Sequence, residues 1–207
     1  MKYNVTESDL RSILEAEAAA IKAIPLTYAY SRAVELIVEQ VDRKGGKLVV
    51  SGMGKAGQIG MNIATTFCST GTPAVFLHPA EAQHGDLGII QRHDLLLLIS
   101  NSGKTSEILK LVELAHVLNP DLKIIVITGD TDSPLAEMAD VTLHTGGAPE
   151  VCPLGLTPTT STTTMTVIGD LLVVSVMKAI GFKVEDYAKR HHGGYLGAKS
   201  AAEASGK

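Results

Sequence analysis

Short apolar runs recur along the chain, and each of them is followed by a turn. Two of these runs, 95–99 and 124–127, are apolar at every position. A run that is apolar throughout is typical of a strand covered on both faces in a parallel sheet. The short runs rich in leucine and β-branched residues together predict five strands, at 48–51, 74–77, 95–100, 124–128 and 141–143.

Helical patterns lie between and around these strands. In 105–118 the apolar residues recur every three or four positions, which places them on one face of a helix. Ser133 and Pro134 are typical of a helix N-cap followed by the first helical residue, so a short helix is expected through 138. Further helices are predicted at 7–23, 28–41 and 161–180.

This alternation of strands and helices predicts a doubly wound α/β fold with a five-stranded parallel sheet flanked by helices. We expect the flavodoxin-like strand order 2-1-3-4-5, with ligands at the carboxyl ends of the strands. No internal repeat or linker divides the sequence, so one domain over 1–207 is expected. Its predicted parts are N-terminal helices (1–45), a sheet core (46–145), C-terminal helices with a histidine motif (146–200) and a flexible tail (201–207).

The composition is that of an ordinary globular protein, with 45% hydrophobic residues, 19% charged residues and a formal net charge of -4. This balance argues against a nucleic-acid binder, which needs a concentrated Lys and Arg surface. The two cysteines, Cys68 and Cys152, are too few for a disulfide framework and favour a reducing compartment.

The sequence also argues against membrane insertion and export. The first ten residues lack the apolar run of a secretory signal. The most apolar stretch, 165–180, is interrupted by Asp170 and Lys178 and falls short of the ~20 residues of a membrane span. We interpret it as a buried helix in which Asp170 is a satisfied buried carboxylate. A cytoplasmic protein without a membrane partner is expected.

The first predicted strand is followed by Gly-Met-Gly-Lys-Ala-Gly, residues 52–57, which matches the dinucleotide-binding fingerprint. A dinucleotide site normally has Asp or Glu at the end of the second strand. Here that strand ends at His78, so NAD is disfavoured and no cofactor is expected. The glycines allow either a close approach of the backbone to a ligand or tight packing of a helix on the sheet.

The third predicted strand runs into Ser-Asn-Ser-Gly-Lys-Thr-Ser, residues 100–106. Hydroxyls and free amide groups at a helix start suit a phosphate monoester, because they donate hydrogen bonds to an anion. The alternative is that one hydroxyl is an N-cap and the others face solvent. In the expected strand order, the loops after the first and third strands flank one pocket. The candidate phosphate-binding residues are Gly54, Ser100, Asn101, Ser102, Gly103 and Thr105.

Five ordered motifs carry a family resemblance. They are the glycine loop at 52–57, His-Pro-Ala-Glu-Ala-Gln-His-Gly-Asp-Leu-Gly at 78–88, Ser-Asn-Ser-Gly at 100–103, Cys-Pro-Leu-Gly-Leu at 152–156 with Pro-Thr-Thr-Ser-Thr at 158–162, and His-His-Gly-Gly-Tyr-Leu-Gly at 191–197. Together they resemble the sugar isomerase (SIS) domain of D-arabinose 5-phosphate isomerases over nearly the whole chain. The resemblance implies interconversion of D-ribulose 5-phosphate and D-arabinose 5-phosphate, without a redox cofactor, at the start of Kdo synthesis for lipopolysaccharide.

The resemblance also implies an assembly and a mode of control. Members of the family usually form homotetramers, so a homotetramer with shared active sites is expected. Similar enzymes often continue into a pair of CBS domains, whereas this chain resembles a stand-alone SIS domain. Any feedback control is therefore expected in the active site, with CMP-Kdo as the candidate ligand. Where the family commonly has Ser-Gly-Glu-Thr, this chain has Lys104, a cation beside the proposed phosphate site.

Site residues are carried over from the family by position. Aldose-ketose isomerisation passes through an enediolate and needs a base near pH 7 and donors to two oxygens. By resemblance, His191 and Glu150 are the acid and base candidates. The other carried-over residues are His84 (ring opening or proton transfer), Lys55 (a cation near the enediolate or phosphate) and Glu107, with His78 and His192 as additional candidates. His192 stands where the family usually has proline, which bears on how His191 is positioned.

Several of these residues have a simpler structural explanation. Glu107, in the first turn of a helix, can complement the helix dipole, and His84 can be a turn residue bonded to backbone. The histidines and Glu150 lack the sequential spacing of zinc ligands, so no required metal is expected. Two rival functions remain open, a non-catalytic sugar-phosphate sensor and an isomerase of the same fold for another phosphosugar.

Overall fold

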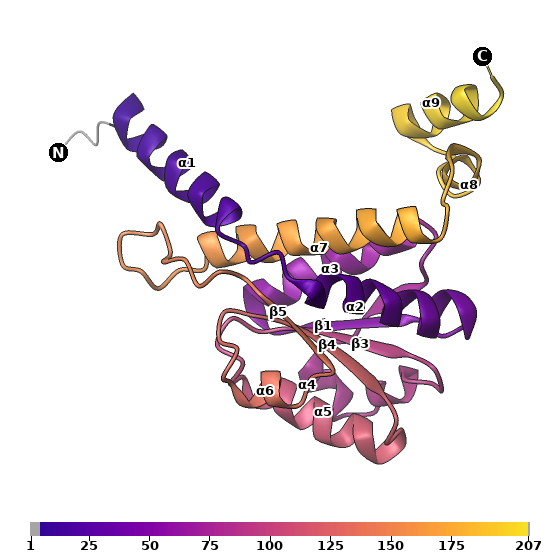
Figure 1. Cartoon of the computed structure of the whole chain (residues 1–207), viewed down its shortest axis with the longest axis horizontal. Coiled ribbons are helices and arrows are strands. Elements are labelled where there is room, and N and C mark those ends of the chain that lie inside the picture. Colours follow the sequence, from indigo (N-terminus) through magenta and orange to yellow (C-terminus); the bar gives the residue numbers. More distant parts are fainter. Residues whose placement is uncertain (1–4, 207) are drawn as a thin grey trace.

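The core of the protein is a parallel sheet of five strands in the order β2-β1-β3-β4-β5 (Figure 1). A computed structural model describes residues 5–206. The strands are Leu48–Gly52 (β1), Ala74–Phe76 (β2), Leu95–Ile99 (β3), Lys123–Thr128 (β4) and Val141–His144 (β5), each within about one residue of its predicted bounds. The predicted fold class and strand order are confirmed. The order reverses between β1 and β3, which pair in parallel along their whole length and therefore end side by side.

Helices cover both faces of the sheet, because successive strand residues point to opposite sides. In β3, Leu95, Leu97 and Ile99 join the core under one helical layer, while Leu96 and Leu98 join the core under the other. The first layer contains α2 (Tyr28–Ile37), α3 (Gly54–Ser69) and α7 (Thr160–Ala179). The second contains α4 (Pro79–Ala82), α5 (Ser106–Leu118) and α6 (Pro134–Glu137). A π-helical turn, Val38–Arg43, prolongs α2, and a 3-10 turn, Asp86–Ile89, follows α4.

Helix α7 is long and apolar enough to cross a membrane by length and composition, but half of its most apolar window is buried inside the protein. It packs against α3, where Gly169 lies so close that a Cβ would come within 2.5 Å of Ile63 Cγ1. The prediction of a buried core helix is confirmed for the face of α7 that packs against α3. The prediction for Asp170 is wrong: its side chain lies on the exposed face of α7, so water solvates it.

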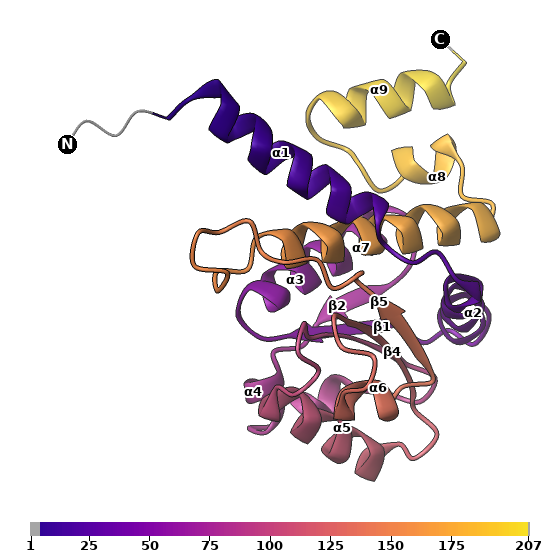
Figure 2. The same ribbon diagram turned by 60° about the vertical axis from the view of Figure 1, so that its left-hand side comes forward.

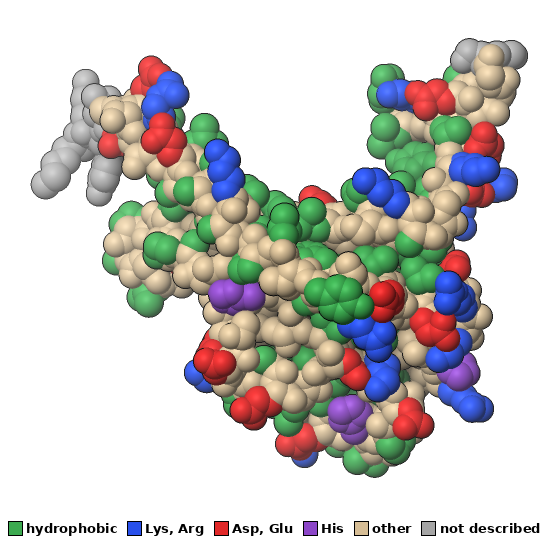
Figure 3. Space-filling model, in the orientation of Figure 1, with side chains coloured by type: hydrophobic (Ala, Val, Ile, Leu, Met, Phe, Trp, Pro, Cys, Tyr) green, Lys and Arg blue, Asp and Glu red, His purple; other side chains and the backbone are tan. Residues whose placement is uncertain are grey.

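Three helices at the two ends of the chain project from this body (Figures 1 and 2). They are α1 (Glu7–Lys22), α8 (Val184–Ala188) and α9 (Gly194–Ala204). Figure 3 shows hydrophobic side chains along these helices. Leu14 of α1 is 68% exposed and Tyr195 of α9 is 78% exposed. Helix α9 continues to Ala204, into the segment 201–207 expected as a flexible tail, through an alanine-rich segment of high helix propensity. Lys207, the end of that tail, lies outside the described residues.

Candidate functional site

A cleft of about 370 Å³ opens at the carboxyl ends of β1 and β3. Its walls come from the start of α3, the loop after β3, and the loop that leads into α7. The structure brings six of the sequence-predicted site residues together as part of its lining: Lys55, Ser100, Asn101, Ser102, Thr105 and Glu150. The cleft therefore lies where the fold places ligands, at the reversal of the strand order.

The glycine loop packs α3 tightly against β1. A Cβ on Gly57 would come within 2.5 Å of the Gly52 carbonyl oxygen, so a larger residue at 57 would push the helix off the strand. Gly54 adopts a φ of 57°, which favours glycine. Of the two explanations for these glycines, tight helix packing accounts for Gly57. The packing also places the exposed Lys55 at the rim of the cleft, in the first turn of α3.

The loop after β3 is organised by its own hydroxyls. Ser100 Oγ lies 2.9 Å from Thr105 Oγ1 and accepts a hydrogen bond of 3.1 Å from the Gly103 N–H. The Ser102 hydroxyl accepts from the Lys104 N–H at 3.2 Å. Thr105 is the N-cap residue of α5 but makes no side-chain cap hydrogen bond. This counts against the simple N-cap alternative, because the Thr105 hydroxyl pairs with Ser100 Oγ instead.

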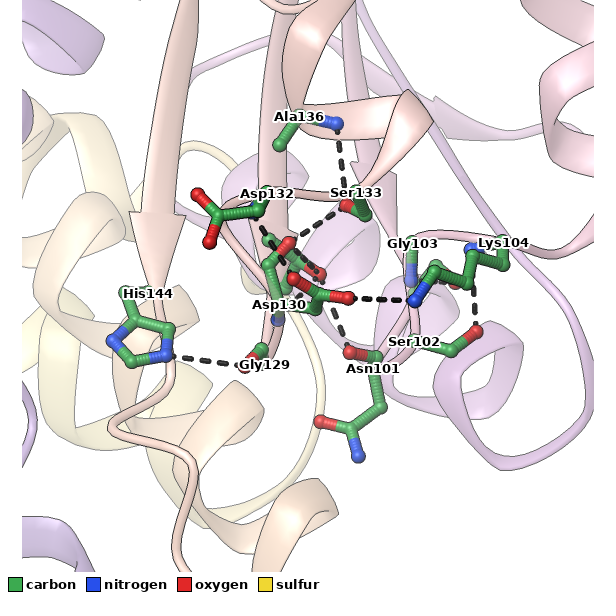
Figure 4. A network of polar contacts seen from close by, with 12 residues as sticks. Asn101, Ser102, Gly103, Lys104, Gly129, Asp130, Asp132, Ser133, Ala136 and His144 are labelled. Carbon is green, nitrogen blue, oxygen red and sulfur yellow. Dashed lines mark hydrogen bonds and ion pairs between the residues drawn. The ribbon is translucent and has the colours of Figure 1, made fainter.

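The loop after β4 contacts the bend 100–105 through hydrogen bonds and an ion pair (Figure 4). The Gly129 N–H donates to the Asn101 carbonyl oxygen at 3.0 Å, and the Ser133 hydroxyl donates to the Asp130 carbonyl oxygen at 2.7 Å. Asp130 Oδ2 also lies 2.9 Å from Lys104 Nζ. The Lys104 side chain is thereby turned toward the β4 loop, and Lys104 is absent from the cleft lining although Ser102 and Thr105 are part of it.

Glu150 is held at the start of α7. Its Oε2 accepts hydrogen bonds from the Thr159 N–H (2.7 Å), the Thr159 hydroxyl (2.9 Å) and the Ser161 N–H (3.2 Å). Partial burial raises the pKa of the Glu150 carboxyl, but the hydrogen bonds from Ser161 and Thr159 outweigh it and bring the pKa below its usual value. Glu150 is therefore a carboxylate at neutral pH, in the same cleft as Lys55.

His78, His84 and Glu107 lie outside the residues that line the cleft. His78 and His84 are exposed, before and after α4. Glu107 accepts a hydrogen bond from the Ser106 hydroxyl, and its own backbone N–H, that hydroxyl and the nearby His78 lower the pKa of its carboxyl. A carboxylate that bonds the first turn of α5 fits the helix-dipole explanation of Glu107.

His191 and His192 lie beyond the far end of α7. The cleft is at the N-terminus of α7, whose 20 residues at 1.5 Å each extend about 30 Å, and α8 and α9 follow its C-terminus (Figures 1 and 2). The His191 ring stacks on Tyr187 with centroids 3.7 Å apart, and its Nδ1 lies 3.1 Å from the Tyr187 carbonyl oxygen. His192 is exposed. The described part of a single chain does not bring either histidine to its own cleft.

The structure adds polar residues that the sequence reasoning did not select. Ser161 and Thr162 line the cleft, although only their membership in the 158–162 motif marked them. Cys152 belongs to the loop before α7 that forms one wall of the cleft. Hydrogen bonds from Thr157 and from the loop amides lower the pKa of its thiol to about 6. Within residues 5–206, no group of three or more His, Cys, Asp or Glu side chains is placed to hold a metal ion.

Comparisons with known proteins agree on one family. Residues 43–175 match the SIS domain family. The chain is 52% identical over 154 residues to arabinose 5-phosphate isomerase KdsD of Escherichia coli K12, and 49% identical over 152 residues to KdsD of Pseudomonas aeruginosa. These matches cover 74% and 73% of this chain and 46% of each relative. The chain thus spans about half the length of the curated relatives it matches.

Solved structures resemble the whole fold. A Bacteroides fragilis protein proposed as a phosphosugar isomerase involved in capsule formation has 69% identity and a TM-score of 0.90, covering 91% of this chain and 98% of its own. A protein of E. coli CFT073 in complex with arabinose 5-phosphate has 31% identity and a TM-score of 0.81, covering 90% of this chain and 100% of its own. The region matched by the family contains the whole described cleft.

Proposed function

Because the chain belongs to the SIS domain family, we propose that it is an isomerase that interconverts D-arabinose 5-phosphate and D-ribulose 5-phosphate. The observation that carries the proposal is the joining, in one cleft, of the hydroxyl-rich bend 100–105 with Lys55 and the Glu150 carboxylate. These groups supply a phosphate site, a cation and a proton acceptor, which are the chemical needs of this reaction. The two relatives with 52% and 49% identity are named as arabinose 5-phosphate isomerases, which supports the same substrate.

The proposed mechanism is a proton transfer between C1 and C2 of the open-chain sugar. The bend 100–105 binds the phosphate group through its hydroxyls and the amide groups at the start of α5. A base takes the proton from C2 of the aldose, and the electrons form an enediolate across C1 and C2. One proton moves from O2 to O1 and another returns to C1, so O1 becomes a hydroxyl and O2 becomes the ketone oxygen. Lys55 stabilises the enediolate oxygen, and Glu150 with His191 exchanges the protons.

A homotetramer with shared sites completes this proposal. The lining of the cleft within residues 5–206 contains no histidine, while His191 lies beyond the opposite end of α7. A second copy that brings its α8 and α9 to the cleft supplies His191, and with it His192. His84 and His78 are exposed on the same side of the sheet as α4 and α5 and are available to assist at a shared site.

We assign the reaction to the cytoplasm, at the start of Kdo synthesis for lipopolysaccharide. The relative involved in capsule formation supports a sugar-supply role of the same kind. CMP-Kdo is the proposed feedback ligand, because an anionic sugar nucleotide suits a cleft that joins a phosphate loop and Lys55. Calorimetric titration of CMP-Kdo with and without arabinose 5-phosphate tests this. Competition supports it, and independent binding or no binding rejects it.

A coupled assay with a panel of pentose and hexose phosphates tests the activity itself. We expect turnover of arabinose 5-phosphate and ribulose 5-phosphate, lost in His191→Ala and Glu150→Ala while both variants still bind the sugar phosphate. Binding without turnover by the unmodified protein would instead identify a sugar-phosphate sensor. Turnover of a different sugar would leave the reaction class in place and replace the substrate.

A further inference from the structure

A carboxylate on the projecting helix α1 reaches the start of α7 behind the cleft. The Thr160 hydroxyl, at the first residue of α7, donates a hydrogen bond of 3.2 Å to Glu17 Oε1. The same hydroxyl oxygen accepts a hydrogen bond of 3.1 Å from the Val151 N–H. Helix α1, the loop that precedes α7 and the start of α7 are thus linked through one hydroxyl, whose single proton is directed at Glu17.

Thr160 is placed between the two residues that hold Glu150. Thr159 and Ser161 donate to Glu150 Oε2, whereas the Thr160 hydroxyl donates to Glu17, and Thr160 is 1% exposed. Val151, the third member of the link, directly follows Glu150 in the chain. The contact with Glu17 therefore lies next to both the donors to Glu150 and the backbone that carries it.

Simple packing of α1 does not explain a carboxylate at position 17. Glu17 Oε2 is buried and has no hydrogen-bond partner within the described residues. A buried acceptor without a donor loses its hydration without compensation, which destabilises the fold. Departures of this kind from good packing are expected where a side chain serves the site.

We propose that Glu17 is a positioning residue for the isomerase site: through Thr160 it fixes the first turn of α7, and that turn holds the Glu150 carboxylate in the cleft. The proposal rests on the proposed function for its effect on turnover. The hydrogen bond that links Glu17 to the first turn of α7 comes from Thr160, and Glu17 acts through that residue. Lys55 is the other charged side chain that lines the described cleft with Glu150.

The experiment compares Glu17→Leu with Glu17→Gln in the full chain. Leucine removes the acceptor, so the turn loosens and the donors to Glu150 weaken. In carboxyl-labelled protein, NMR titration is expected to show the Glu150 pKa moving up, because its lowering depends on those donors. Turnover is expected to fall about tenfold in kcat with little change in KM, and the acid limb of the pH profile to move to higher pH. Glutamine keeps an oxygen for Thr160 and is expected to restore both readouts.

Two further variants keep the result interpretable. Thr160→Val removes the same hydrogen bond from the other side and is expected to reproduce the Glu150 titration of Glu17→Leu, with no added effect when the two are combined. Glu15→Leu changes an exposed carboxylate on the same helix and is expected to leave both readouts unchanged.

Unchanged Glu150 titration and unchanged kcat in both Glu17→Leu and Thr160→Val would overturn the proposal, as would a failure of glutamine to rescue. Absence of turnover in the unmodified protein would reject the proposed function instead. The titration of Glu150 would still decide the role of Glu17 in that case, because it does not depend on activity.

Discussion

Lys104 Nζ and Asp130 Oδ2 form an ion pair at 2.9 Å, so the lysine of the bend 100–105 faces the loop after β4 and not the cleft. Lys104 is 63% exposed at its side chain, and the bend presents neutral hydroxyls and amides to a ligand. The pair thus limits the positive charge that an anion meets in the cleft. This arrangement leads to a direct prediction about binding.

Asp130→Asn is expected to strengthen binding of inorganic phosphate and of arabinose 5-phosphate. Removing the carboxylate frees Lys104 to reach the anion, and since the pair is exposed the gain is at most about fivefold in Kd. Calorimetry at low and at 0.5 M salt, roughly the range over which exposed charges become screened, measures it. The gain should vanish at high salt and in the double variant Lys104→Met/Asp130→Asn. A gain that persists in the double variant contradicts the explanation.

Gly103→Ala is expected to destabilise the bend. Gly103 has a φ of 60°, and a Cβ there would collide with Ser133 Oγ, which the Asp130 carbonyl oxygen holds in place. The conformation alone costs about 1–3 kcal/mol for a residue other than glycine, and the collision adds to it. Urea unfolding measures the loss. Gly88→Ala is the matched control, because nothing lies within 4 Å of a Cβ at Gly88.

The Cys152 thiol is expected to react with iodoacetamide mainly as a thiolate at neutral pH. Thr157 and the loop amides lower its pKa to about 6, so the rate should reach half its maximum near that pH. The measurement is made in a Cys68→Ser background. Thr157→Val should move the midpoint to higher pH, because the Thr157 hydroxyl is the largest cause of the shift. A midpoint that does not move would argue against this cause.

The hydrogen bonds of Glu150 predict a contribution to stability that depends on pH. The pKa of its carboxyl is lower in the folded protein than in the unfolded chain, so the unfolded chain takes up protons more readily as the pH falls. The contribution is therefore complete above the usual pKa of 4.5 and is lost as the pH falls through the lower, folded value. Unfolding of the unmodified protein and of Glu150→Gln between pH 7 and 3 measures it. The two curves should converge toward acid, and parallel curves would contradict the expectation.

Shared sites predict complementation between inactive variants. Glu150→Ala and His191→Ala each lack one proposed catalytic group, but a mixed assembly contains sites that combine an intact Glu150 with an intact His191 of another copy. Unfolding and refolding the two variants together should restore measurable turnover. Each variant refolded alone is the control. No recovery from a mixture that does assemble would place both residues in the same subunit's site.

The amino-acid sequence by itself determined the elements and their order. All-apolar runs such as 95–99 form strands because both their faces are buried, and Ser133 with Pro134 starts α6 because a hydroxyl caps the helix and proline suits its first position. The loop after β3 could also be identified as a candidate binding loop, because its hydroxyls and the strand before it are local features of the sequence. Gly54 and Lys55 were expected near this loop because the predicted strand order places the ends of β1 and β3 side by side.

Only the tertiary structure decided which side chains share the cleft. Ser161 and Thr162 enter its lining, while His84 and His191 stay outside the cleft of their own chain, because such placement depends on where whole helices pack. Residues 201–204 belong to α9, within the segment expected as a flexible tail, and Asp170 is exposed where burial was expected. The bond from Thr160 to Glu17 joins residues 143 positions apart. A sequence pattern indicates contacts between residues a few positions apart. Contacts between residues more than a hundred positions apart form only once the sheet and its helices have assembled.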